Sequence, residues 1–487
     1  MRRALLEGEI MRTTNPIKFG TDGWRAVIAE TFTFDNVRIC AQATADYLKQ
    51  AGLAEWGLVI GYDTRFASED FAAAAAEVIA GNGIKVYLSP TSVPTPVISY
   101  GVTYKKAGGA IIITASHNPG SYNGFKVKSP DGASAPTDAI KQIETHVARI
   151  FASGEIKRIS REEAEKKGLI QSFDIAPAYC SRMGELVNLD ALKKANLKVV
   201  IDSMYGAGSG YTKSLLSGGN LRLEEINSER NPAFPGMQQP EPIAHNLKKL
   251  SDKVRYVGAN VGLATDGDAD RIGIIDENGQ FLTQLQVFAL LALYMLEVRG
   301  ERGAIVKTLT TTMMLDRLGE IYKVPVFETP VGFKYVAPIM LRENALIGGE
   351  ESGGYGFRGH VPERDGILAG LYFLDMMVRT GKSPAQLLAY LYSKVGPHYY
   401  DRIDIKFEES QRQAILKRVR EHEPQSITGT KVIRIDTTDG FRFILADNSW
   451  LLIRFSGTEP LLRIYAESDS MKRVGKMLEA GREITGV

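Results

Sequence analysis

The segment LVIGYDTRFASEDFAAAAAEVIAGNGIKVYL, residues 58–88, decides the fold class. It begins with a short apolar run, Leu58 to Gly61, continues as an alanine-rich stretch with helical spacing, Phe71 to Gly83, and ends in a second run, Lys85 to Leu88. The order strand, helix, strand is typical of a βαβ unit, which places parallel strands in one sheet. A further apolar run, Ile111 to Thr114, predicts another buried strand in that sheet.

The same order recurs twice later in the chain, which predicts three related α/β units. The second copy is predicted as strand Leu197 to Asp202, helix Tyr211 to Leu216 and strand Leu221 to Ile226. The third copy is predicted as strand Ala304 to Lys307, helix Met313 to Tyr322 and strand Val324 to Glu328. No residue-level repeat accompanies this order.

The last part of the chain has a different pattern, which predicts an α+β domain. Its expected strands are Tyr400 to Ile405, Lys431 to Asp436, Phe441 to Leu445 and Trp450 to Arg454, and its expected helices are Ser410 to Glu421 and Met471 to Thr485. The charged segment Ser153 to Gln171 suits an interdomain connection. We therefore expect four domains, over residues 1–160, 161–280, 281–392 and 393–487.

Composition restricts the function classes. The 487 residues carry 59 Lys and Arg against 57 Asp and Glu, a net charge of +2, which argues against a nucleic-acid or membrane partner. The longest apolar run, Val287 to Leu296, is about half the ~20 residues of a membrane helix, so it predicts a buried helix. Two cysteines, Cys40 and Cys180, build neither a disulfide framework nor a zinc site, and a cytoplasmic location is expected.

An acidic motif, DGDADR at residues 266–271, directly follows the apolar run Val261 to Ala264. In extended chain, residues two apart point the same way, so Asp266, Asp268 and Asp270 are predicted to converge. Two carboxylates ~4 Å apart repel by about 4 kcal/mol at an effective dielectric near 20, so the trio needs a cation. Oxygen ligands favour Mg²⁺ over zinc. A solvated acidic turn is the alternative, while the EF-hand's glycine at position six and glutamate at position twelve are missing.

A hydroxyl-bearing segment, TASHNPG at residues 114–120, also follows a predicted strand, where ligands of α/β sheets bind. Ser116 is a candidate nucleophile with Lys126 nearby in sequence. The adjacency of Ser116 and His117 is no sign of a catalytic dyad, because neighbours in extended chain diverge. A plain turn around Pro119 explains the same residues equally well.

Two further loops have the chemistry of ligand sites. The segment RFSGTEP, residues 454–460, with Arg463 beyond it, offers guanidinium groups, hydroxyls and backbone N–H groups to a phosphate, although a tight β-turn is an alternative. The segment GGEESGG, residues 348–354, offers carboxylates and a hydroxyl to sugar hydroxyls, or serves as a hinge. Neither a Walker loop nor a dinucleotide fingerprint is complete, so ATP and NAD are unsupported.

Five motifs together resemble the α-D-phosphohexomutase superfamily, and they occur in the order seen there across nearly the whole chain. They are FGTDGWR (19–25), TASHNP (114–119), DGDADR (266–271), GEESG (349–353) and RFSGTEP (454–460). The resemblance implies an isomerase with four domains around a central cleft: three similar α/β mixed-sheet units and a C-terminal α+β phosphate-binding domain. Its partner would be a small sugar phosphate, and the protein a monomer or homodimer.

The resemblance also implies the chemistry. Ser116 would carry a phosphoryl group, adding about −1.5 to −2 charge beside Mg²⁺ held by Ser116 and the three aspartates. It would exchange that group with a hexose 1-phosphate through a hexose 1,6-bisphosphate, and glucose 1,6-bisphosphate would serve as intermediate and activator. Lys126 and His117 would take part in proton transfer, and Arg25 and Arg271 would stabilise negative charge near the serine.

The remaining roles follow the same resemblance. Glu350 and Ser352 would bind sugar hydroxyls. The unreactive phosphate would be held by Arg454, Ser456, Gly457, Thr458 and Arg463. The loop Glu350 to Gly354 and the segment Thr329 to Lys334 look closer to glucose-type mutases, whereas dual glucose/mannose enzymes often carry His where Phe333 stands.

Glucose is therefore the first expected substrate, with phosphomannomutase and phosphoglucosamine mutase activities as alternatives. A sugar-phosphate phosphatase and a non-catalytic sugar-phosphate binder are candidates from other classes. Ser116 and all three aspartates are present, which argues against the non-catalytic binder.

Overall fold

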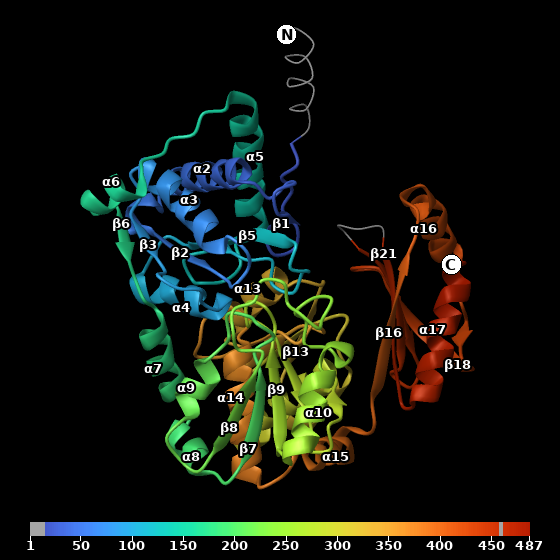
Figure 1. Ribbon diagram of the computed structural model, residues 1–487. Helices are drawn as coiled ribbons and strands as arrows, with labels where there is room; N and C mark the ends of the chain where they lie inside the picture. The colour runs from blue at the N-terminus through green and yellow to red at the C-terminus, as the bar shows by residue number, and fades with distance from the viewer. Residues whose placement is uncertain (1–14, 457–460) are drawn as a thin grey trace. The chain divides into compact units, whose positions relative to one another are not determined.

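The computed structural model describes residues 15–456 and 461–487 and divides the chain into two compact units (Figure 1). The first unit contains the N-terminal part of the chain through Phe281 and the later segment Gly354–Asp375. The second unit contains Leu282–Gly353 and Met376–Val487. Among the described residues, no helix combines the length and the apolar character needed to cross a bilayer.

The first unit begins with a six-stranded mixed sheet. Its order is β1 (Trp24–Val27), β5 (Tyr122–Lys128), β4 (Ala110–Ile113), β2 (Leu58–Tyr62), β3 (Val86–Leu88) and β6 (Ile170–Ser172). The neighbours β4, β2, β3 and β6 are parallel, and β5 is antiparallel to both β1 and β4. The predicted βαβ order is confirmed here.

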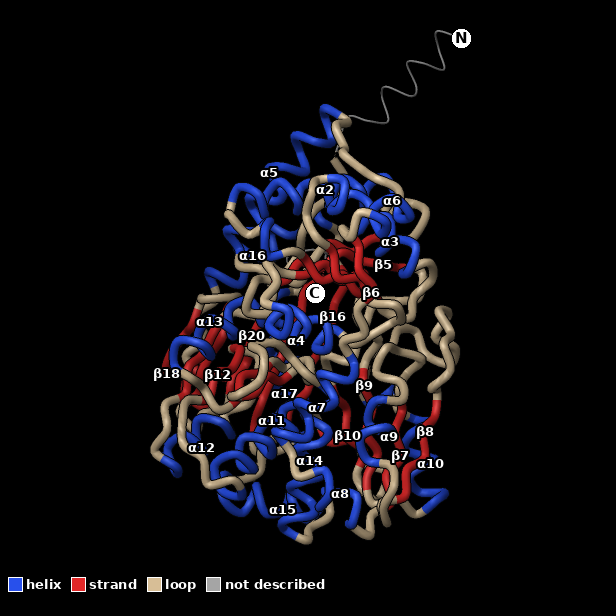
Figure 2. Tube along the Cα trace, turned by 90° about the vertical axis from the view of Figure 1, so that its left-hand side faces the viewer, coloured by secondary structure: helices blue, strands red, loops and turns tan. Residues whose placement is uncertain are grey.

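Helices cover both faces of this sheet. On one face α2 (Phe34–Gln50) packs against α3 (Ser68–Gly81) and α5 (Thr137–Ser153), and their alanines and aliphatic side chains form one core with β2 and β4. Figure 2 shows α2 and α3 on the same side of strands β5 and β6. On the other face lies α4 (Thr95–Lys105), whose Ile98 Cδ1 would be 2.1 Å from a Cβ at Gly61, so β2 needs glycine there.

The charged segment 153–171 differs from its expected role as a connection. It contains α6 (Arg161–Lys166), and β6 follows at its end and pairs in parallel with β3. Ile170 is 3% exposed and belongs to the core of the first sheet. The first sheet therefore extends to Ser172, beyond the charged surface of the segment. The expected domain boundaries stay predictions.

The first unit contains a second mixed sheet, in which β9 lies between an antiparallel and a parallel neighbour. Its strands in this unit run β10 (Ile272–Ile275), β9 (Val261–Thr265), β7 (Lys198–Asp202) and β8 (Arg222–Ile226). The accompanying helices are α7 (Ala176–Leu186), α8 (Leu189–Lys194), α9 (Tyr211–Leu216) and α10 (Lys248–Val257). The chain leaves this unit through β11 (Phe281–Leu282) and returns to it with β15 (Tyr355–Phe357) and the start of α14 (Gly366–Thr380).

The second unit begins with a third α/β arrangement. Strand β12 (Ile305–Thr308) pairs in parallel with β13 (Val326–Thr329) and β14 (Ile347–Gly349). Its helices are α11 (Gln284–Leu293), which continues into a π-helical turn (Tyr294–Val298), α12 (Met314–Tyr322), α13 (Phe333–Glu343) and α15 (Pro384–Val395). The predicted apolar helix is α11 with its π turn, and its residues from Val287 to Leu296 are buried.

The C-terminal part of the second unit is an antiparallel six-stranded sheet with helices. The sheet order is β16 (Tyr399–Lys406), β21 (Leu461–Ser468), β20 (Trp450–Phe455), β19 (Phe441–Leu445), β18 (Thr430–Asp436) and β17 (Ser426–Ile427). Helix α17 (Met471–Thr485) packs on β16, β20 and β21, beside α16 (Arg412–Glu421) (Figure 1). The predicted fold class, three α/β units and an α+β domain, is confirmed, but β21 was missing from the sequence prediction.

Candidate functional site

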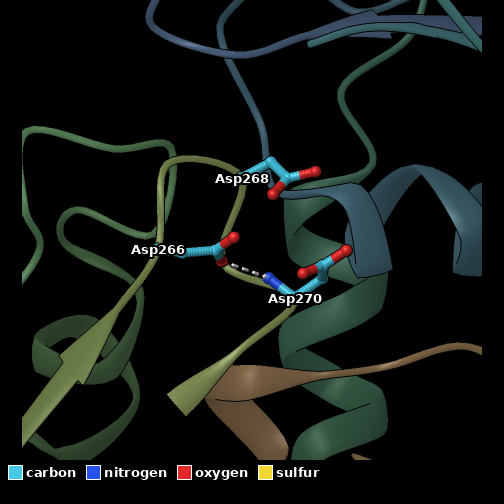
Figure 3. Close-up of side chains that lie close together, drawn as sticks. All are labelled: Asp266, Asp268 and Asp270. Carbon is cyan, nitrogen blue, oxygen red and sulfur yellow. Dashed lines mark hydrogen bonds between the residues drawn. The ribbon is translucent and has the colours of Figure 1, made fainter. Parts of the chain in front are cut away.

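The acidic motif forms a tight turn after β9. The Ala269 N–H bonds the Asp266 carbonyl oxygen over 3.0 Å, and Ala269 has a left-handed φ of 54°. Asp266 Oδ1 accepts the N–H groups of Asp270 and Arg271 at 3.0 and 3.1 Å, which closes the turn. Figure 3 shows the carboxylates of Asp266, Asp268 and Asp270 around one space, with one oxygen from each within 4.8 Å of the others. The predicted convergence is confirmed, but a turn produces it and not an extended strand.

These three carboxylates are buried, and the charged form is disfavoured in two of them. Burial raises the pKa of Asp266 well above its ordinary value, and repulsion from Asp270 and Asp268 raises it further. Burial also raises the pKa of Asp270. One oxygen on Asp268 and one on Asp270, Oδ1 in each case, are buried and have no hydrogen-bond partner within residues 15–456 and 461–487. Two such oxygens within a cluster of three buried carboxylates fit a hard divalent cation such as Mg²⁺.

Ser116 lies in the loop after β4 and reaches the acidic turn. Its side chain is buried, and its Oγ donates a hydrogen bond to Asp266 Oδ2 over 2.9 Å. Its backbone has a left-handed φ of 52°, held in part by the bond from the Ser116 N–H to Thr114 Oγ1 at 2.9 Å. A Cβ at Gly267 would lie 2.4 Å from the Ser116 carbonyl oxygen. The absence of a side chain at Gly267 therefore allows the serine loop to approach the acidic turn.

Arg65, which the sequence analysis did not single out, organises the serine loop. Its guanidinium is buried and paired with Asp63, with Nε 3.1 Å from Oδ2. It donates to four backbone carbonyl oxygens of the loop and of β5, those of Ser116, Asn118, Pro119 and Tyr122. The signal in the sequence was an ionic pair directly after the predicted strand β2.

Lys126 supplies positive charge to the acidic turn from β5. Its Nζ lies 2.8 Å from Asp268 Oδ2, 2.8 Å from Asp22 Oδ2 and 3.5 Å from Asp270 Oδ2. Burial lowers the pKa of Lys126, but the attraction of these carboxylates outweighs it and the pKa lies above its ordinary value. Lys126 is therefore an ammonium ion in this state, and it offsets the negative charge of the acidic turn.

Arg364 is a second cation at the turn and was also missed by the sequence analysis. Its Nη2 lies 2.8 Å from both Asp270 Oδ2 and Asp22 Oδ2. Its neighbour Glu363 is buried and bonds Lys128 of β5. The sequence has three consecutive charged residues at this position, Glu363 to Asp365. Such a run is typical of an exposed surface, and only the tertiary structure shows that Arg364 contacts Asp270.

The other predicted catalytic residues surround the serine loop. His117 Nδ1 lies 3.4 Å from Ser116 Oγ, and burial followed by repulsion from Arg271 and Arg25 lowers the pKa of His117 well below its ordinary value. Arg25 Nη1 donates to Asn118 Oδ1 over 2.7 Å. Arg271 Nη1 donates to Glu241 Oε1 over 3.1 Å. The imidazole is therefore neutral and the two guanidinium groups border the same loop.

The predicted sugar and phosphate residues lie in the second unit. Glu350 and Ser352 follow β14, and Glu350 is 7% exposed. Arg454 on β20 and Arg463 on β21 are directly opposed in the strand register. The Ser456 N–H bonds the Leu461 carbonyl oxygen over 2.8 Å. Gly457 and Thr458 lie outside the described residues.

The two opposed arginines form a like-charge pair that two carboxylates offset. Asp439 Oδ1 accepts from Arg454 Nε over 3.0 Å, and Asp404 Oδ2 lies 3.6 Å from Arg463 Nε. Like charges directly opposite one another on a sheet are destabilising. Two guanidinium groups presented together are suited to a doubly charged anion such as a phosphate ester.

Comparison with known proteins gives four matches to family models. They are the models described as phosphoglucomutase/phosphomannomutase alpha/beta/alpha domains I, II and III, over residues 16–153, 177–279 and 284–395, and the C-terminal domain, over residues 403–484. Together they cover most of the chain.

Individual relatives align along nearly their whole length. A phosphoglucomutase/phosphomannomutase from Thermococcus kodakarensis is 34% identical over 95% of this chain and 97% of its own. A probable phosphoglucosamine mutase from Methanothermobacter thermautotrophicus is 33% identical over 97% and 98%. The crystal structure of a candidate phosphomannomutase from Thermus thermophilus is 35% identical, covers 98% of this chain and 100% of its own, and superposes with a TM-score of 0.85.

Proposed function

The chain belongs to the phosphoglucomutase/phosphomannomutase family of isomerases, and we propose that it interconverts α-D-glucose 1-phosphate and glucose 6-phosphate. The proposal is carried by one observation: a buried serine hydroxyl bonded to one of three convergent aspartates. This places a candidate phosphoryl carrier next to a candidate metal site. The reaction would proceed through a phosphoserine at Ser116 and a glucose 1,6-bisphosphate.

In the first transfer, a free hydroxyl of the sugar phosphate attacks the phosphorus on Ser116. A new O–P bond forms to the sugar, and the bond between phosphorus and Ser116 Oγ breaks. The sugar hydroxyl loses a proton and Ser116 Oγ gains one, so the protons balance. The bisphosphate then turns over and returns its other phosphoryl group to Ser116 by the reverse steps, which leaves the isomeric monophosphate.

Two side chains near Ser116 would carry the proton transfers. His117, whose Nδ1 lies 3.4 Å from Ser116 Oγ, would take up a proton, and Lys126 would supply one. Arg25 and Arg271 stabilise the charge that spreads over the phosphoryl oxygens. Asp266, Asp268 and Asp270 would hold Mg²⁺, which when bound neutralises phosphoryl charge and polarises the phosphoryl oxygen.

The sugar would be bound by the second unit. Glu350 and Ser352 would hold its hydroxyls, and Arg454, Ser456, Gly457, Thr458 and Arg463 would hold the phosphate that does not react. Phe333, at the start of α13, has no hydrogen-bonding group, which supports glucose ahead of mannose. Phosphomannomutase and phosphoglucosamine mutase activities are the second candidates, because similar proteins carry these names.

The test combines a substrate panel with intact-mass measurement. Wild type is assayed on the 1-phosphates of glucose, mannose and glucosamine, each with its 1,6-bisphosphate, while free phosphate is monitored. Glucose should react fastest with negligible phosphate release, whereas steady release would identify a phosphatase. Wild type and the control Ser153→Ala, at an exposed serine, should gain one phosphoryl group from glucose 1,6-bisphosphate. Ser116→Ala should gain none and lose turnover.

A further inference from the structure

The loop proposed to bind sugar carries a glutamate, Glu351, that is already held by the C-terminal sheet. Tyr400 OH donates to Glu351 Oε1 over 2.8 Å. Arg402 Nη1 donates to Glu351 Oε1 and Oε2 over 3.0 and 3.3 Å. The Glu351 side chain is 18% exposed and that of Arg402 is 28% exposed, so solvent screens the pair only in part. Both oxygens of Glu351 are therefore bound by β16.

The same strand connects Glu351 to one of the proposed phosphate arginines. Arg402 Nε lies 3.1 Å from Asp404 Oδ1, and the other oxygen of Asp404 faces Arg463 at 3.6 Å. Asp404 and Arg463 are directly opposed in the β16–β21 register. Alternating charges thus run from the sugar loop to the phosphate arginine: Glu351, Arg402, Asp404 and Arg463.

A second, separate connection joins the other phosphate arginine to the loop before α13. Asp439, in the turn between β18 and β19, accepts from Arg454 Nε through Oδ1 over 3.0 Å and from the Val331 N–H through Oδ2 over 3.0 Å. Val331 belongs to the segment 329–334, whose sequence supports glucose as substrate. One oxygen of Asp439 therefore binds the side chain of Arg454, and the other binds the backbone of the loop before α13.

We infer that Arg402 and Asp439 are positioning residues that determine sugar selectivity without touching the sugar. Each ties a sugar-side loop of the second unit to an arginine that would hold the distant phosphate, so this inference rests on the proposed function. Linkage requires that if occupancy of the arginines stabilises one loop position, the loop position alters phosphate affinity by the same factor. Loss of either tie leaves the loops free to take positions suited to other hexoses.

The experiment measures kcat and KM of Arg402→Gln and Asp439→Ala on the 1-phosphates of glucose, mannose and glucosamine. Each variant should change the ratio of kcat/KM between glucose and the better of the other two sugars by roughly fivefold, mainly through KM. Asp439→Asn keeps one acceptor oxygen and should change the ratio less. Glu351→Ala should change the ratio in the same direction as Arg402→Gln, and the double variant should be little worse than either single one, because each change removes the Glu351–Arg402 ion pair.

The matched control is Arg473→Gln. It breaks an ion pair between α17 and Asp447, which lies between β19 and β20, and involves neither sugar-side loop. It should leave the sugar ratio unchanged, and all variants should unfold within a few degrees of the control. An equal loss on all three sugars, or additive effects of Glu351→Ala and Arg402→Gln, would overturn the inference.

Failure of the proposed function gives a different result. Wild type that isomerises none of the three sugar phosphates refutes the mutase, and the inference is then judged on binding of the same compounds by calorimetry. There, an unchanged ratio of Kd between sugars in both variants overturns the inference, and a roughly fivefold change supports it.

Discussion

Ser116 Oγ and Asp266 Oδ2 are 2.9 Å apart, which joins the loop after β4 to the turn after β9. The two residues come from different sheets of the first unit, so the site depends on how closely these loops approach. The charges that meet there are three carboxylates, the Lys126 ammonium and the Arg364 guanidinium. Metal binding, steric packing and charge compensation at this site can each be tested.

Metal removal should abolish turnover. EDTA should eliminate isomerase activity and excess Mg²⁺ should restore it, because Asp268 Oδ1 and Asp270 Oδ1 find no hydrogen-bond donor in the described part of the chain. Mg²⁺ at about one hundred times its Kd should also raise the free energy of unfolding by about 2.7 kcal/mol. Asp268→Asn should lose that increase, as measured by chemical denaturation. Full activity in EDTA would contradict the proposed metal site.

Gly267→Ala should damage the site through sterics alone. The added Cβ would lie 2.4 Å from the Ser116 carbonyl oxygen, so one of the two loops must move. We expect a loss of about 1–3 kcal/mol in unfolding free energy and a large fall in kcat. The control is Gly475→Ala in α17, where a Cβ meets nothing within 4 Å and stability should rise by about 0.5–1 kcal/mol. Equal effects of the two changes would contradict the packing argument.

Lys126→Met should leave buried carboxylates without a counter-charge. Asp22 and Asp268 each lie 2.8 Å from the Lys126 Nζ, whose side chain is 1% exposed. Breaking a buried ion pair costs about 3–5 kcal/mol, which urea denaturation would measure. The control Lys141→Met removes a lysine that is 71% exposed and 3.9 Å from Asp138, and should cost well under about 1 kcal/mol. Similar losses in the two variants would refute the charge assignment.

Glu328 should contribute acid-sensitive stability to the second unit. Burial raises the pKa of Glu328, but Lys307 and Arg442 outweigh it and the pKa lies below its ordinary value. A carboxyl with a depressed folded-state pKa stabilises above its unfolded pKa of about 4.3, and this stability is lost as the pH falls through the folded value. Glu328→Gln should therefore be less stable than wild type at pH 7, and the difference should close in acid.

The comparison for that pH series is Glu320→Gln, at an exposed position of α12. Its stability should follow that of wild type at every pH. A gap between wild type and Glu328→Gln that stays constant from neutral pH into acid would show that Glu328 acts through packing and not through its charge.

The sequence predicted many of the strands and helices from their apolar periodicity, but it missed others with an apolar sequence, such as β10. Helices α9 and α17 and strand β19 have the predicted bounds. Strand β21 was missed because Arg463 and Glu467 interrupt its apolar pattern, although Glu467 is 1% exposed. Its burial depends on partners such as His398 Nδ1, 2.9 Å away and far along the chain.

The sequence likewise predicted some residues of the candidate site and missed others. The three aspartates were predicted from a contiguous motif that follows a strand, and Ser116 was singled out by the resemblance of its motif to the phosphohexomutase superfamily. It missed Arg65 and Arg364, whose roles arise from contacts with segments distant in sequence. Local spacing reveals which groups converge within one loop, while charge compensation between loops depends on the tertiary fold.

The return of segment 354–375 to the first unit has a consequence for biosynthesis. The acidic turn leaves the ribosome before Arg364 does, so a nascent chain that ends between them holds the aspartates without this counter-charge. Domains generally fold as they are synthesised, starting from the N-terminus. Here the aspartates of the first unit gain the Arg364 counter-charge only after translation has passed Arg364. A gene fragment that stops at Phe281 therefore encodes an incomplete unit.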